Sequence, residues 1–282
     1  MGDSSGSSSV AKSQDSEKRH EKNSYDATQK ILPVERYLTT EAEDRTLALA
    51  RNKLVEKCMR SAGYSDFMMP PHVGNPVKLI TRRYGLTDLN EAQRRGYEPT
   101  DNEASENSTS EFNESLSPDA RKRLVGDSGA PVEPGSRLRD PGCLGHALEV
   151  INGSKPPYEK IDAAAMKVQA DSWNRSFRDG RLINYFEKWS ACMRRSGYSF
   201  RTPMDAPGEG KMNKSKEIKM AVTEVKCNIS SGLLDRWYAI DSDYQKTLIR
   251  KNIVALEKGR KVMDSRLRTA RAELATDRRS RP

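Results

Sequence analysis

Two similar stretches of this sequence place a cysteine, an arginine and a tyrosine at a fixed spacing. The first reads VEKCMRSAGYSDF over residues 55–67, and the second reads WSACMRRSGYSF over residues 189–200. A cysteine can form a disulfide, bind a metal or act as a nucleophile, so this repeat is where chemistry is most readily sought. The repeat contains two of the chain's four cysteines, Cys58 and Cys192.

Four cysteines can form two disulfides, with three possible pairings. Each copy of the repeat supplies one cysteine and is followed by one later cysteine, so the simplest pairs are Cys58 with Cys143 and Cys192 with Cys227. In one alternative the two repeat cysteines pair with each other, and in another all four are free thiols. No two cysteines have the short spacing of a zinc ligand pair or of a redox Cys-x-x-Cys motif, so we predict no metal site.

One segment resembles an enzyme motif. Residues 126–131 read GDSGAP, which is similar to the nucleophile loop of chymotrypsin-like serine proteases. That chemistry needs a histidine base beside the serine, and the upstream His20 and His72 lie in a polar leader and a proline-rich loop. Phosphate-binding loops, HExxH and a paired acid and base are also absent from the sequence. We therefore predict no catalytic residue and no cofactor.

Five aromatic residues offer a binding alternative. Trp173, Trp189 and Trp237, together with Tyr64 and Tyr198, could line a groove for a glycan or a peptide. Core packing and helix capping are the simpler interpretation. Trp189 belongs to the clearest amphipathic helical stripe, and the two tyrosines follow glycines that end helices.

These residues must be positioned by helices, because the apolar periodicity is helical throughout. We predict a mainly α fold of two related helical halves, each closed by a disulfide, with a long carboxyl-terminal helix and a disordered amino-terminal tether. The predicted parts are a Ser/Gly-rich tether at 1–31, a first half at 32–153 with a polar loop at 98–117, a second half at 154–275 and a basic tail at 276–282.

Capping residues predict where the helices begin and end. Thr39 or Thr40 is expected to cap the first helix, which Gly63 ends. Residues 233–274 are expected to form one long helix with a coiled-coil-like apolar spacing. A helix of this length would extend about 60 Å, so we expect it to project, to pair with another element, or to bend near Gly259.

The overall charge predicts acidic partners. The chain of 282 residues has a net charge of +9, and 32% of its residues are charged. An anionic envelope surface, or another envelope protein bound through the long helix, fits this charge. Nucleic acid is the weaker choice, because the basic carboxyl-terminal end lacks interleaved aromatics for base stacking. No apolar run reaches the ~20 residues of a membrane span, and we interpret the start of the sequence as that of a processed chain.

Three segments carry a resemblance to a known group. EKWSACMRRSGYSF at 187–200, DPGCLGHALEVI at 140–151 and the cysteine ahead of the terminal helix at 225–258 are similar to segments of actinobacterial extracytoplasmic proteins and lipoproteins. The resemblance covers roughly 34–275 and is strongest over 180–260. It implies an extracytoplasmic, membrane-anchored protein, and the GDSSGSSS segment is similar to a lipoprotein tether. The group brings no assigned activity or catalytic residue.

We therefore expect a non-enzymatic cell-envelope protein that acts in binding or as a scaffold. The alternative is a cytosolic, nucleic-acid-associated helical protein with free thiols.

Overall fold

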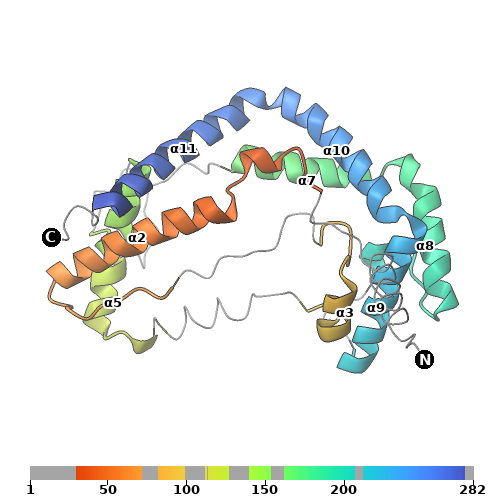
Figure 1. Cartoon of the computed structure of the whole chain (residues 1–282), viewed down its shortest axis with the longest axis horizontal. Helices are drawn as coiled ribbons and strands as arrows, with labels where there is room; N and C mark the ends of the chain where they lie inside the picture. Colours follow the sequence, from red (N-terminus) through yellow and green to blue (C-terminus); the bar gives the residue numbers. More distant parts are fainter. Residues whose placement is uncertain are drawn as a thin grey trace, which may run out of the picture. The chain divides into compact units, whose positions relative to one another are not determined.

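The protein is described by a computed structural model over residues 30–71, 82–98, 112, 114–126, 140–153, 162–206 and 212–276 (Figure 1). Within these ranges the chain forms nine α-helices and no β-strand, which confirms the predicted mainly helical fold. Most of the predicted tether and nearly all of the basic tail lie outside the described residues.

The chain divides into two compact units, and each unit is built from three separate segments. Unit 1 comprises Met1–Glu35, Val77–Thr100 and Val168–Lys251. Unit 2 comprises Arg36–Pro76, Asp101–Lys167 and Asn252–Pro282. Each unit contains one copy of the Cys-Met repeat and one disulfide.

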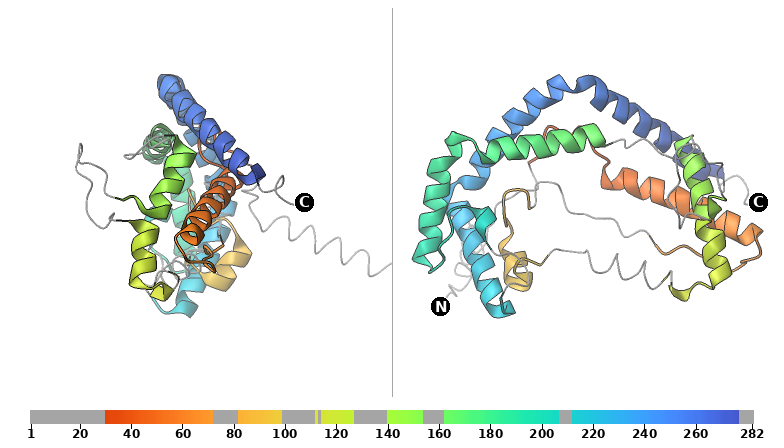
Figure 2. Two further views of the ribbon diagram at one scale, coloured as in Figure 1. Left: turned by 90° about the vertical axis from the view of Figure 1, so that its left-hand side faces the viewer. Right: turned by 180° about the vertical axis from the view of Figure 1, so that it is seen from behind.

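Unit 2 packs four helices around an apolar core. They are α2 (Glu41–Ser61), α5 (Pro118–Val125), α6 (Gly142–Asn152) and α11 (Ile253–Ala275). Figure 2 shows α11 beside α2, and the two helices are in contact. Buried residues from α2, α5 and α6 make up the larger apolar cluster, which includes Val55, Met59, Leu124 and Ala147.

The beginning of α2 follows from its sequence. The hydroxyl of Thr40 accepts a hydrogen bond from the Glu43 amide, and the Glu43 carboxylate accepts one from the Thr40 amide. This capping box satisfies two amides that have no partner within the helix. Thr40, one of the two predicted capping residues, therefore begins the helix.

Unit 1 contains the remaining helices. They are α3 (Leu89–Arg95), most of α7 (Ala163–Phe177), α8 (Ile183–Arg195), α9 (Lys214–Ser231) and α10 (Leu233–Lys251). Trp237 of α10 lies at the centre of an aromatic cluster. Its ring centroid is 5.2–6.0 Å from those of Tyr84, Trp173, Phe177 and Phe186. Aromatic side chains therefore supply much of the core of this unit.

The carboxyl-terminal helical run differs in one detail from its prediction. It is long, but Asn252 interrupts it between α10 and α11, with φ −116° and ψ 17°. A bend near Gly259 was one of the three alternatives, but the interruption lies at Asn252, and Gly259 is inside α11. Asparagine competes for backbone hydrogen bonds in non-helical conformations, which makes it a suitable residue for the interruption.

The end of the predicted polar loop at 98–117 is also more ordered than expected. Phe112 packs edge-on against Phe67, with 5.9 Å between ring centroids, and Leu116 contacts the same apolar cluster. Ser117 then caps α5, and Pro118 occupies its first turn, a common arrangement at helix starts. Residues 99–111 and 113 of this loop lie outside the described part.

Candidate functional site

The four cysteines form two disulfides. Cys58 is bonded to Cys143 and Cys192 to Cys227, and the Cα–Cα distance is 5.6 Å in both. These are the pairs favoured in the sequence analysis, and 5.6 Å is the usual separation for a disulfide. The sulfur atoms therefore cross-link helices, and no free cysteine remains in the described chain.

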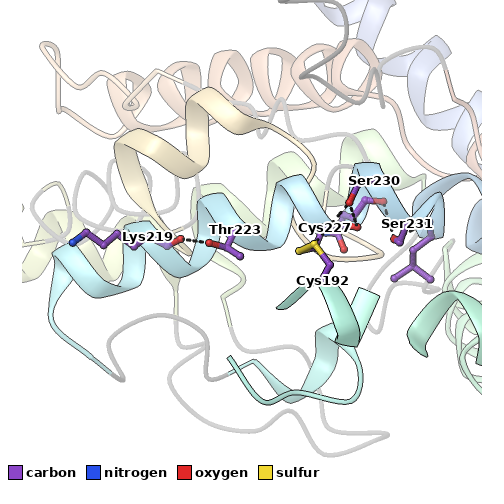
Figure 3. Close-up of a disulfide and its surroundings, with 8 residues drawn as sticks. Cys192, Lys219, Thr223, Cys227, Ser230 and Ser231 are labelled. Carbon is purple, nitrogen blue, oxygen red and sulfur yellow. Dashed lines mark hydrogen bonds between the residues drawn. A yellow bond between two sulfur atoms is a disulfide. The ribbon is translucent and has the colours of Figure 1, made fainter. Parts of the chain in front are cut away.

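The bridge of unit 1 joins the end of α8 to α9 near the end of that helix (Figure 3). Cys227 is buried, and the Sγ of Cys192 lies 3.8 Å from the hydroxyl of Ser230. Ser230 in turn donates to the carbonyl of Cys227 at 3.5 Å. The hydroxyl beside this disulfide is therefore engaged within the last turn of α9.

The methionine and tyrosine of each repeat form the same helix end. Met59 and Met193 are completely buried. The amide of Tyr64 donates to the carbonyl of Met59 at 3.1 Å, and the amide of Tyr198 donates to Met193 at 3.1 Å. Each hydrogen bond closes the last helical turn through a glycine with positive φ. The repeated stretch is thus one structural device used once in each unit.

The repeat has a further feature that the sequence did not reveal. In unit 2 the guanidinium of Arg60 donates to the carbonyl of Phe67 at 3.3 Å. In unit 1 the hydroxyl of Ser190 donates to the carbonyl of Phe200 at 2.5 Å, and Arg194 donates to that hydroxyl at 3.1 Å. In both units a side chain of the helix therefore donates a hydrogen bond to the carbonyl of a phenylalanine that follows the helix. The donor is Arg60 in unit 2 and Ser190 in unit 1.

The tryptophans do not form an exposed groove. Trp189 and Trp237 are completely buried. The indole of Trp237 donates to the hydroxyl of Ser176 at 2.8 Å, and the indole of Trp173 donates to the carbonyl of Arg83 at 2.9 Å. Tyr64 and Tyr198 are half-buried at the helix ends. These contacts agree with core packing and capping.

A buried ion pair lies within unit 1 and was not predicted. The Nε of Arg83 lies 2.6 Å from Oδ2 of Asp241, and the hydroxyl of Tyr84 donates to the same oxygen at 2.7 Å. The amide of Gln245 donates to the other carboxylate oxygen at 3.4 Å. Burial and the neighbouring carboxylate raise the pKa of Tyr84 well above its ordinary value.

The same network ties separate segments of unit 1 together. Arg83 also donates to the carbonyl of Gln169 at 2.7 Å and to the hydroxyl of Ser172 at 3.1 Å. The side chain of Gln245 accepts from the amide of Val34 at 3.1 Å. Both charged side chains, Arg83 and Asp241, are thus hydrogen-bonded to other groups of the protein. This is typical of a buried ion pair with a structural role.

Two buried glutamates of α9 hold the segment that contains α3. The carboxylate of Glu224 accepts from the Tyr97 hydroxyl at 2.6 Å and from the Leu86 amide at 3.1 Å. Glu217 accepts from the Tyr97 amide at 3.0 Å. Burial raises the pKa of Glu224, while its hydrogen bonds lower it in part. These acids, like Asp241, are used to position backbone and side chains.

The protease-like segment is only partly described. Gly126 ends α5 with φ +66°, and a Cβ there would lie 2.0 Å from the carbonyl oxygen of Asp140. The glycine is therefore required by close backbone packing against the start of α6. Ser128, His20 and His72 lie outside the described residues. The third histidine, His146, lies on α6, where its exposed ring is 3.5 Å from the carboxylate of Glu149.

The outward side of α11 is an exposed, basic helical surface of unit 2. One stripe of this helix consists of six exposed residues at spacings of three and four, which we name the outer face of α11: Val254, Lys258, Lys261, Ser265, Arg268 and Ala272. Its opposite side is buried in the core of unit 2 through Leu256, Met263, Leu267 and Ala270. The apolar spacing expected for a coiled coil is thus used inside this unit, and the outer face is left for other interactions.

Other classes of site are not formed by the described residues. No group of three or more histidine, cysteine, aspartate or glutamate side chains is arranged to hold a metal ion there. None of the described helices combines the length and apolar character needed to cross a bilayer. Comparisons with protein-family models, with curated proteins and with solved structures found no match.

Proposed function

We propose that this protein is a non-enzymatic component of the cell envelope that acts in binding or as a scaffold. The observation that carries the proposal is the pair of disulfides, one in each unit. Disulfides of this kind persist in extracytoplasmic compartments and are rare in a reducing cytosol. A disulfide in each unit would keep the surface of that unit folded in a compartment outside the reducing cytosol.

The interior chemistry supports a binding role over a catalytic one. Asp241 is paired with Arg83 and accepts a hydrogen bond from Tyr84, and Glu224 accepts hydrogen bonds from Tyr97 and from a backbone amide. Catalytic acids and bases need access to a substrate proton, whereas these groups are enclosed by protein. The exposed charges, including those of the outer face of α11, are therefore the groups available for recognition.

The resemblance to actinobacterial extracytoplasmic proteins and lipoproteins extends the proposal to a membrane-anchored form. The serine and glycine residues of the amino-terminal segment at 2–9 suit a tether between a lipid anchor and the folded units. Anchoring would hold the outer face of α11 within reach of the envelope and so favour weak interactions.

Fractionation of the source cells tests this proposal. We expect the chain in the envelope fraction, and we expect a protease added to intact spheroplasts to digest it. A cytosolic enzyme of known location serves as the control and should survive the protease. Recovery of the chain in the cytosolic fraction, protected from the protease, would contradict the proposal and favour the nucleic-acid-associated alternative.

A further inference from the structure

The outer face of α11 combines positive charge with exposed apolar atoms. Lys258, Lys261 and Arg268 lie on one stripe with Val254, whose side chain is 79% exposed. The stripe extends about 27 Å from its first to its last residue at the helical rise per residue. A long positive surface with an exposed valine at one end is suited to a partner that has both negative charge and an apolar region in which the valine side chain can be buried.

Part of the positive charge of this face is not neutralised by neighbouring acids. Lys261, Arg268 and the adjacent exposed Arg271 form no ion pair within the described residues. Asp264, on the flank of the face, is paired with Arg260 at 2.8 Å. Glu257 is the exposed acid beside these cations. Lys261, Arg268 and Arg271 outnumber Glu257, so the surface they share has a net positive charge.

A depression of about 580 Å³ adjoins this charged stripe. It lies between the end of α6 and the first half of α11 and is lined by Asn152, Val254, Glu257, Lys258, Lys261, Val262 and Ser265. Two valines and two lysines therefore border the same space. Lysine can place its alkyl chain against an apolar surface while its ammonium group reaches polar oxygens.

We propose that the outer face of α11 docks on an anionic phospholipid bilayer, with lysine and arginine at the headgroup phosphates and Val254 inserted among the upper acyl atoms. This inference rests on the proposed envelope location and specifies the surface that meets the membrane. A polyanion such as DNA would use the cations but would gain little from an exposed valine. The face also has no aromatic side chain on which bases could stack.

Vesicle binding by the full-length oxidised chain tests the docking. Phosphatidylglycerol/phosphatidylcholine vesicles should sediment the protein, phosphatidylcholine vesicles should not, and added salt should weaken the interaction. The double variant Lys261→Gln/Arg268→Gln should lose roughly 25-fold in affinity, from about fivefold for each cation. Val254→Ser should weaken binding to vesicles and leave binding to DNA unchanged.

The matched control is Lys219→Gln/Lys226→Gln on α9. It removes the same charge from exposed positions of another helix and should retain most of the affinity. An equal loss in both double variants would overturn the proposal, because it would show attraction through net charge alone. Equally strong binding to DNA with no effect of Val254→Ser would also overturn it. Neither result would change the fractionation, so failure of this docking is distinguishable from failure of the envelope location.

Discussion

Arg83 and Asp241 form a buried ion pair in which the two side chains are 6% and 0% exposed. The residues are 158 positions apart, and their contact joins the segment before α3 to the middle of α10. Removing one partner leaves a buried charge without its counter-ion. The resulting loss of folding free energy is larger than the net stabilisation that the pair itself provides. Substitution of either residue therefore tests whether the two side chains are paired in the core of unit 1.

We predict that Asp241→Asn destabilises the protein by about 3–5 kcal/mol, because the Arg83 cation stays buried without its anion. The control is Asp243→Asn on the same helix. Asp243 is 62% exposed and lies 4.0 Å from Arg181, so its loss should cost less than about 1 kcal/mol. Urea denaturation followed by circular dichroism measures both variants, and similar losses would contradict the buried pair.

The ion pair of Glu43 and Arg260 predicts a pH dependence within unit 2. Hydrogen bonds from Arg260 lower the pKa of Glu43 to about 2, below its ordinary value. A lowered carboxyl pKa contributes stability above the ordinary pKa near 4.5, and this stability is lost as the pH falls towards 2.

Glu43→Gln should therefore cost about 2 kcal/mol at pH 7 and almost nothing near pH 2. Glutamine can retain the capping box, so the change isolates the charge. Glu41→Gln, in the same first turn but at an exposed position, is the control and should have a small effect at both pH values. A loss for Glu43→Gln that is the same at pH 7 and near pH 2 would exclude the ion pair as its cause.

Gly96 is predicted to be required for the contact between the α3 segment and α9. It has φ +66°, and an added Cβ would lie 2.4 Å from Oε1 of Glu217. Gly153 has the same φ but a different ψ, 17° against −123° at Gly96, and an added Cβ there would meet nothing within 4 Å in the described structure. Gly96→Ala should cost about 2–4 kcal/mol and Gly153→Ala about 1 kcal/mol. Equal costs, measured by denaturation, would show that Gly96 is not closely packed.

Removing either disulfide should destabilise the protein. The bridges close loops with sequence separations of 85 and 35 residues. The chain-entropy relation predicts losses of about 4–5 kcal/mol for Cys58→Ser/Cys143→Ser and about 4 kcal/mol for Cys192→Ser/Cys227→Ser. Chemical denaturation of the two variants measures this, and an unchanged midpoint in either one would show that its bridge does not stabilise the fold.

Local sequence signals predicted the helix ends well. Thr40 with Glu43 and Ser117 with Pro118 lie within a few residues of the groups they satisfy, so their patterns are readable in the sequence. The disulfide pairs were the simplest of three arrangements because the repeat assigns one later cysteine to each copy. The interruption at Asn252 was missed, since the apolar spacing continues on both sides of it.

Contacts between distant residues could not be predicted in the same way. Arg83 and Asp241 carry no local signature, and Asp241 looks like an exposed charge until the fold buries it. The tethering of the Phe67 and Phe200 carbonyls uses different donors in the two copies, so the repeat did not reveal it. Which residues form the outer face of α11 depends on which side of that helix packs into unit 2. The sequence pattern alone did not show whether the apolar stripe of the helix packs inside the unit or pairs with another chain.

The most direct test of the account is a disulfide map of the chain isolated from its source cells with thiols blocked at lysis. Proteolysis and mass spectrometry should recover one cross-linked peptide pair with Cys58 and Cys143 and another with Cys192 and Cys227. Four blocked thiols, or a cross-link between Cys58 and Cys192, would contradict the two stapled units and the extracytoplasmic function proposed from them.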